Sequence, residues 1–194
     1  MRKFTLLSVV AVFYGCAVGF VADRASIEDE SHSSIQVSAG VIASENQSIN
    51  TAGVAYSYRY PINPHVELSF ESPFDAIFDS SSYTWFLWPT VSGKFSFSGE
   101  GLHAAMKMGM GMLAGMAKGD SSISIYPVPR FSAMLGLGNP EKFTIGFTAP
   151  PFYFWGAYRM GRFSLFGTFT FATFSFLDSS YPVVGLSGGV SLDF

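Results

Sequence analysis

Charged residues are scarce in this sequence, and six of them follow one pattern. Charged side chains make up 13% of the 194 residues, against roughly 25% in typical soluble domains. Each of the six has the parity opposite to that of its apolar neighbours: Arg59, Glu67, Glu71, Lys94, Lys107 and Arg130. Such a set can form buried ion pairs or line a narrow ion path. Because an unpaired buried charge is costly, we expect the opposite charges to pair.

Other side chains with reactive groups give weaker signals. His65 and His103 share the parity of the charged set, whereas His32 lies in a Ser/Asp/Glu-rich stretch and is expected to be solvated. The Asp-Ser-Ser triplets consist of ordinary turn formers and begin at Asp79, Asp120 and Asp178. Four alternating methionines lie on the apolar face, where lipid contact is more plausible than a soft-metal site: Met106, Met108, Met110 and Met112. We therefore predict no catalytic residues, no metal and no cofactor.

The segments that carry these residues alternate with a period of two, which indicates β-strands. The alternation is clearest at the C-terminus, where one face carries Val184, Leu186, Val190, Leu192 and Phe194. The pattern predicts ten strands: Ser34–Ala43, Thr51–Tyr60, His65–Phe74, Thr84–Ser98, Leu102–Ala117, Ser122–Leu137, Lys142–Ala149, Phe152–Arg159, Phe163–Ser175 and Pro182–Phe194. The break at Ala149-Pro150-Pro151 is either a kink or a hairpin.

The connections between these segments favour a transmembrane barrel over a soluble β-sandwich. Tight turns such as Gly99-Glu100-Gly101 alternate with longer polar connections such as Asp75–Tyr83, as in barrels with short periplasmic turns and longer outer loops. The face opposite the apolar one is mostly Ser, Thr and Gly. The sequence therefore predicts an all-β fold, a closed antiparallel transmembrane up-and-down β-barrel. Ten strands are preferred and eight are possible.

In such a barrel the polar face lines the lumen, so the six charged residues would point inward. Aromatic residues near strand ends are expected to form girdles at the membrane surfaces. The candidates for these girdles are Trp85, Trp88, Tyr153, Trp155 and Tyr158.

The N-terminus has the pattern of a secretory signal. Arg2 and Lys3 precede an apolar run from Leu6 to Ala22, which is short for a membrane-spanning helix. Cleavage can follow Gly19 or Ala22. We therefore predict a signal peptide over residues 1–22 and a barrel over residues 23–194 that begins with a short periplasmic segment. The only cysteine, Cys16, lies in the signal, so the mature chain has no cysteine for a disulfide or a metal site.

The last twelve residues, Val183 to Phe194, resemble the terminal strand of bacterial outer-membrane β-barrel proteins, in which alternating apolar residues end in an aromatic residue. The segment Gly53–Tyr60, its Pro-Asn turn and Val66-Glu67-Leu68 are similar to a hairpin of the small barrels. The resemblance implies location in the outer membrane of a Gram-negative-type envelope, contact with its lipid, and assembly by the barrel-insertion machinery. It also implies an assembly signal formed by Val190, Leu192 and Phe194. It implies no particular activity.

Three functions fit these features. The first is a structural or surface-exposed barrel with a largely filled, salt-bridged lumen. The second is a narrow, porin-like channel or conduit for small solutes or hydrophobic molecules, and the third is a lipid-modifying enzyme. We favour the first, because a barrel of eight strands is essentially filled by its own side chains and ten strands add little room. No enzyme activity is expected, a net charge of −3 does not suggest nucleic acid, and the oligomeric state is left open.

Overall fold

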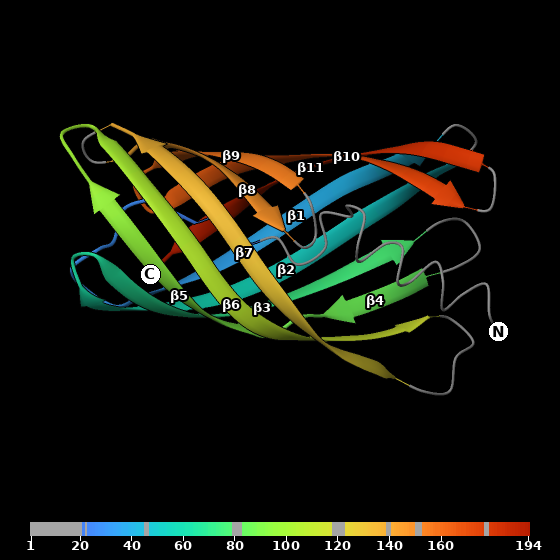
Figure 1. The fold of residues 1–194 in the computed structure, drawn as a ribbon, viewed down its shortest axis with the longest axis horizontal. Helices are drawn as coiled ribbons and strands as arrows, with labels where there is room; N and C mark the ends of the chain where they lie inside the picture. Colours follow the sequence, from blue (N-terminus) through green and yellow to red (C-terminus); the bar gives the residue numbers. More distant parts are fainter. Residues whose placement is uncertain are drawn as a thin grey trace.

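The computed structural model describes residues 21, 23–44, 47–78, 83–117, 123–138, 141–149, 153–176 and 179–194. The predicted signal peptide, apart from residue 21, lies outside these residues, as do the Asp-Ser-Ser triplets that begin at Asp79 and Asp120 and, of the third triplet, Asp178. None of the described residues belongs to a helix long and apolar enough to cross a membrane. Eleven β-strands form a single antiparallel sheet (Figure 1): β1 (His32–Ser44), β2 (Gln47–Asn63), β3 (Val66–Phe78), β4 (Tyr83–Leu87), β5 (Thr90–Ser98), β6 (Leu102–Ala117), β7 (Ser124–Leu137), β8 (Phe143–Ala149), β9 (Tyr153–Met160), β10 (Phe163–Phe176) and β11 (Ser179–Asp193).

Strands β4 and β5 are two parts of one barrel strand. Both pair with β3 on one side and with β6 on the other. The interruption falls at Trp88 and Pro89, where the Trp88 amide donates to Pro73 O (2.9 Å) and the Met112 amide donates to Pro89 O (3.0 Å). Proline has no N–H for the ladder, which accounts for the break at this place. The predicted strand Thr84–Ser98 is thus interrupted, and the barrel has ten strands.

The sheet closes on itself because β1 pairs with both β2 and β11. At this seam Ser33 and Phe194 exchange two backbone hydrogen bonds, of 3.0 and 2.9 Å. The predicted closed antiparallel barrel of ten strands is confirmed, and the alternative of eight is wrong. Strands β8 and β9 pair with each other from Thr148 and Tyr153 onward, so of the two predicted alternatives, a kink and a hairpin, the hairpin is confirmed. The tight turns gather at the barrel end where the chain finishes (Figure 1).

At the opposite end, several strands extend further than predicted. Gln47 pairs with Ser44, and Ser179 pairs with Phe176. Pairing therefore continues into segments that the sequence analysis assigned to loops. The connections at this end are consequently shorter than expected.

Strand β7 extends past its neighbour β8, and the overhang carries two prolines. The pairing with β8 covers only Phe131–Leu137. The Gly138 amide donates to Gly101 O (2.9 Å), next to β6. The Leu137 carbonyl oxygen accepts from the Lys142 amide (3.0 Å), next to β8. Odd-numbered residues of β7 therefore direct their backbone groups to the β8 side. Pro127 and Pro129 are odd-numbered and lie beyond the end of this pairing. Without N–H groups they leave no unsatisfied donor on this edge.

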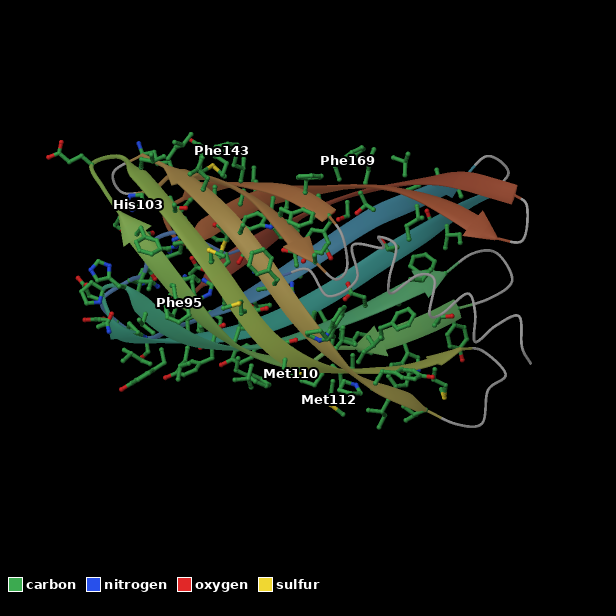
Figure 2. The ribbon with its side chains drawn as sticks, viewed as in Figure 1. Phe95, His103, Met110, Met112, Phe143 and Phe169 are labelled. Atoms are coloured by element: carbon green, nitrogen blue, oxygen red, sulfur yellow. The ribbon has the colours of Figure 1, made fainter. Side chains whose placement is uncertain are left out.

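The two faces of the sheet differ as the alternation predicts. Large apolar side chains project from the outside of the barrel, among them Phe95, Met110 and Phe143 (Figure 2). Met108 and Met110 are 53% and 57% exposed, whereas the intervening polar positions of neighbouring strands face inward and are buried. This arrangement is the reverse of a soluble protein, which keeps its large apolar side chains inside.

Three of the aromatic residues assigned to membrane girdles lie inside the barrel instead. Trp88, Tyr153 and Trp155 are 1%, 1% and 5% exposed, and the prediction for them was wrong. Glycines on facing strands make room for the indoles: a Cβ at Gly111 would overlap the Trp88 ring, and one at Gly146 would overlap the Trp155 ring. Tyr158 lies on the outside, where a girdle residue would be, and is 49% exposed.

Candidate functional site

The six charged residues predicted from parity all lie buried on the inner face, on consecutive strands from β2 to β7. Their exposed fractions range from 1% for Glu67 and Lys94 to 7% for Arg130. Glu67 on β3 stands directly opposite Lys94 on β5, and Lys94 Nζ lies 2.9 Å from Glu67 Oε1. Strand register therefore creates this pair without any contribution from loops.

A second group surrounds Glu71 on β3. Its carboxylate pairs with Lys107 Nζ, and its Oε2 lies 3.1 Å from Arg130 Nη1. Arg130 also donates to Tyr153 Oη (2.9 Å), and its guanidinium lies 5.9 Å from the centre of the Trp88 ring. The two inward aromatic residues thus pack around this cation.

Lys94 and Lys107 face each other directly across β5 and β6, an arrangement that is destabilising unless an anion lies between them. Asp23 supplies that anion. Its Oδ2 lies 2.8 Å from Lys107 Nζ, and its Oδ1 lies 3.4 Å from Lys94 Nζ and 3.3 Å from Arg59 Nε. Sequence analysis assigned Asp23 to a periplasmic segment. In the structure it is among the most deeply buried carboxylates of the described residues.

Asp23 belongs to residues 23–31, which we call the N-terminal segment. These residues form no strand. The Ala25 and Ser26 amides donate to the two Glu141 oxygens (3.0 and 2.8 Å), and Ser96 Oγ donates to Ala25 O (2.5 Å). Ala25 is fully buried and packs in an apolar cluster with Tyr153 and Trp155, among others. The first part of the segment therefore lies inside the barrel and is held by both polar and apolar contacts, whereas residues 29–31 are exposed.

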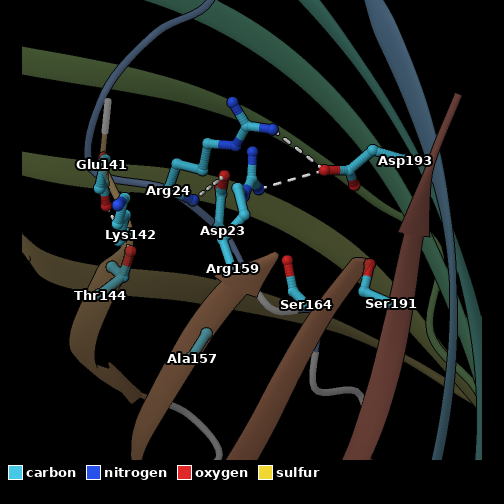
Figure 3. Close-up of a pocket in the computed structure, with 10 residues that line it drawn as sticks. All are labelled: Asp23, Arg24, Glu141, Lys142, Thr144, Ala157, Arg159, Ser164, Ser191 and Asp193. Carbon is cyan, nitrogen blue, oxygen red and sulfur yellow. Dashed lines mark hydrogen bonds and ion pairs between the residues drawn. The ribbon is translucent and has the colours of Figure 1, made fainter. Parts of the chain in front are cut away.

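Further ion pairs attach the segment to the end of the barrel where the chain finishes. Arg24 Nη2 and Arg159 Nη2 lie 3.0 and 3.1 Å from Asp193 Oδ2, and Figure 3 shows both guanidinium groups directed at this carboxylate. Glu28 pairs with Arg24 and with His32 Nδ1, the latter at 2.9 Å. The His32 side chain is 13% exposed. The prediction that it is solvated was therefore wrong.

The sequence contained a signal for some of these unpredicted residues. Arg159 and Asp193 lie on the inward parity of β9 and β11, so the alternation that identified the six charged residues also places these two. Asp23, Arg24 and Glu141 lie outside the strands. Periodicity therefore gave no indication of where they point.

The remaining candidates bring no chemistry to this site. His65 Nδ1 lies 3.2 Å from the backbone oxygen of Ser96. His103 is half-buried, and neither of its buried ring nitrogens has a hydrogen-bond partner among the described residues. The four alternating methionines all lie outside and are about half exposed. Across the described part of the chain, no three His, Cys, Asp or Glu side chains gather in a way that could hold a metal ion.

The Asp23 carboxyl shows how the wall charges act on the N-terminal segment. Burial alone raises the pKa of this group, but the charges of Arg59, Lys107 and Lys94 outweigh burial and hold the pKa well below its usual value. A carboxyl with a depressed pKa stabilises the folded form above its unfolded pKa of about 3.9, and this stabilisation is lost as the pH falls through the lower folded value. The segment should therefore remain docked throughout the neutral and mildly acidic range.

This pH dependence can be measured with a spin label attached at position 29 through Asp29→Cys, a site that is exposed. We expect an immobilised label from pH 8 down to the ordinary pKa of an aspartate, about 3.9, and increasing mobility only at lower pH, because the neighbouring cations hold the pKa of Asp23 well below that value. An added Asp23→Asn substitution should make the label mobile already at pH 7. Release near pH 6 in the unsubstituted chain would contradict the assignment to Asp23.

The closed sheet, its apolar outside and its charged inside define an up-and-down antiparallel β-barrel of ten strands. A scan against protein-family models finds no match to this chain, and a search of curated proteins finds none either.

Solved structures of similar fold include bacterial barrels. Neisserial surface protein A is 12% identical, with 84% of this chain and 97% of that chain covered and a TM-score of 0.41. The attachment invasion locus protein Ail of Yersinia pestis, solved with the heparin analogue sucrose octasulfate, is 17% identical, with 87% and 100% covered and a TM-score of 0.43. The N-terminal β-barrel domain of Pseudomonas aeruginosa OprF is 15% identical, with 83% and 97% covered and a TM-score of 0.34. These similarities are too distant to carry any conclusion about function.

Proposed function

We propose that this chain is an integral outer-membrane protein with a structural or surface-exposed role, whose barrel is closed by its own N-terminal segment. The observation that carries the proposal is the burial of Asp23 among Arg59, Lys94 and Lys107 inside a barrel with an apolar exterior. Backbone groups in hydrocarbon must be satisfied internally, and a closed barrel achieves this. The large apolar side chains outside then contact lipid, and the charges inside neutralise one another.

Export and assembly form part of the same proposal. Residues 1–22 act as a cleaved signal, and the barrel-insertion machinery recognises the terminal strand. The side chains of Val190, Leu192 and Phe194 are 48%, 40% and 58% exposed on the outside of the barrel. They are therefore accessible to a partner during assembly and to lipid afterwards. If cleavage follows Ala22, Asp23 is the first residue of the mature protein.

The proposal assigns the barrel no catalytic role. The charges inside pair with one another, and their carboxylates accept from lysine and arginine. A general acid or base needs a proton to exchange with a substrate within hydrogen-bond reach. Carboxylates engaged in buried ion pairs are poorly suited to that task.

Two measurements on detergent-extracted protein test this function. A membrane barrel should migrate faster on a gel before heating than after it, and reconstituted protein should give no steady conductance in a planar bilayer at neutral pH. A mature chain that is monomeric in water without detergent would refute the membrane location. A stable open conductance of the unmodified protein would refute closure by the segment and would favour the narrow channel.

A further inference from the structure

The inner wall around Asp23 carries more positive than negative charge. The charged wall side chains that form ion pairs with Asp23 or with one another around it are the six described above, four cations and two carboxylates. Glu67 pairs with Lys94, and Glu71 pairs with Lys107 and Arg130. The third carboxylate, Asp23, comes from the N-terminal segment and not from a strand of the wall. The wall alone is therefore a site with an excess of positive charge.

Three nitrogen donors converge on the position of the Asp23 carboxylate. Arg59 Nε comes from β2, Lys94 Nζ from β5 and Lys107 Nζ from β6, and they lie 2.8–3.4 Å from the two Asp23 oxygens. The side chains of the three are 1–7% exposed. They are positioned by strand register, since Lys94 and Lys107 are direct neighbours across the ladder. The donors would thus keep this arrangement if the carboxylate were replaced by another anion.

Asp23 also borders a small pocket near the barrel end where the chain finishes. This pocket is lined mainly by polar residues and lies between the N-terminal segment and the wall formed by β8 to β11 (Figure 3). Asp23 itself lines it, together with the cations Arg24, Lys142 and Arg159 and the carboxylates Glu141 and Asp193. Arg24 and Arg159 are paired with Asp193 in this pocket, whereas the three donors around Asp23 have the carboxylate of the N-terminal segment as their shared partner.

We propose that Arg59, Lys94 and Lys107 form a binding site for a small oxyanion, a carboxylate or a phosphate, which the Asp23 side chain occupies in this structure. This inference rests on the proposed closure of the barrel by the N-terminal segment. The free anion and the segment compete for the same three donors. Charge-assisted hydrogen bonds favour an oxyanion that accepts from several donors at once. Binding of the anion therefore displaces the start of the segment, and the plug becomes responsive to anions.

The test compares two alanine variants of the full mature chain. Asp23→Ala empties the site, whereas Asp29→Ala removes the same charge from an exposed position of the same segment. Inorganic phosphate and acetate are titrated calorimetrically into each refolded barrel at constant ionic strength. We expect the Asp23→Ala barrel to bind at least one of the two at least tenfold more tightly than the unsubstituted barrel and the Asp29→Ala barrel. Adding Lys107→Gln to Asp23→Ala should abolish the gain.

A second measurement does not depend on the folding of the variants. In the otherwise unsubstituted barrel with a spin label at position 29, phosphate or acetate should raise the mobility of the label, and chloride at equal ionic strength should not. The inference is overturned if a barrel that shows the heat-dependent gel shift and no conductance gives neither anion binding after Asp23→Ala nor a response of the label to either oxyanion. That result would leave the proposed closed barrel intact, because the gel shift and the conductance test it separately.

Discussion

Glu71→Gln is expected to lower the free energy of unfolding by about 3 kcal/mol, near the low end of the cost of breaking a buried ion pair. Glu71 is 2% exposed and neutralises both Lys107 and Arg130. After its replacement, Lys107 still has its hydrogen bond to the Asp23 carboxylate, and Arg130 still donates to Tyr153 Oη. These remaining partners are the reason for an estimate at the low end. Urea unfolding of the barrel in lipid vesicles measures the effect.

The matched control is Glu100→Gln, which makes the same change in the exposed turn between β5 and β6. It should change stability by less than about 0.5 kcal/mol, as is usual for surface substitutions. Equal stabilities of the two variants would show that Glu71 is hydrated and that the ion pairs inside the barrel do not stabilise it.

Met108→Arg should have an effect of similar size for a different reason. Met108 is 53% exposed on the outside of β6, near the middle of a strand that runs from Leu102 to Ala117. Arginine on the lipid face of a barrel costs about 2–4 kcal/mol at the bilayer midplane and about 0–1 kcal/mol near its surfaces. Because Met108 lies near the middle of its strand, the free energy of unfolding in lipid vesicles should fall by about 2–4 kcal/mol.

Leu102→Arg provides the depth control on the same strand. Leu102 is 49% exposed and begins β6 beside a tight turn, so the same substitution should cost at most about 1 kcal/mol there. If both arginines were tolerated equally, the outside of the barrel would face water and the membrane location would fail. The pair thus tests the lipid-facing surface independently of the charges inside.

The two expected effects concern opposite faces of the sheet, and two adjacent residues of β6 connect them. Lys107 points inward to Asp23 and Glu71, and Met108 points outward. A shift of one residue in the register of β6 would bring Lys107 to the lipid and Met108 to the ion pairs. The charged network is therefore coupled to correct strand register. We expect variants that weaken the network to populate misassembled barrels more often than outward-facing apolar substitutions do.

The alternation in the sequence, together with the pattern of its connections, was sufficient to predict the fold. It located ten strands, with β4 and β5 joined, and it assigned a face to nearly every strand residue, because side chains alternate strictly along a strand. The inward parity also applies to Tyr153 and Trp155. They were nevertheless assigned to girdles because aromatic residues near strand ends are common there. In these two cases the parity was the better guide.

The sequence by itself determined which wall side chains face inward and that their charges have opposite signs, because period-two alternation is a local property of the chain. Only the tertiary structure decided what neutralises the excess of positive charge. Asp23 and Lys107 are 84 residues apart, and Ala25 and Glu141 are 116 apart. Such contacts form only when the barrel closes around a segment that has no periodicity of its own.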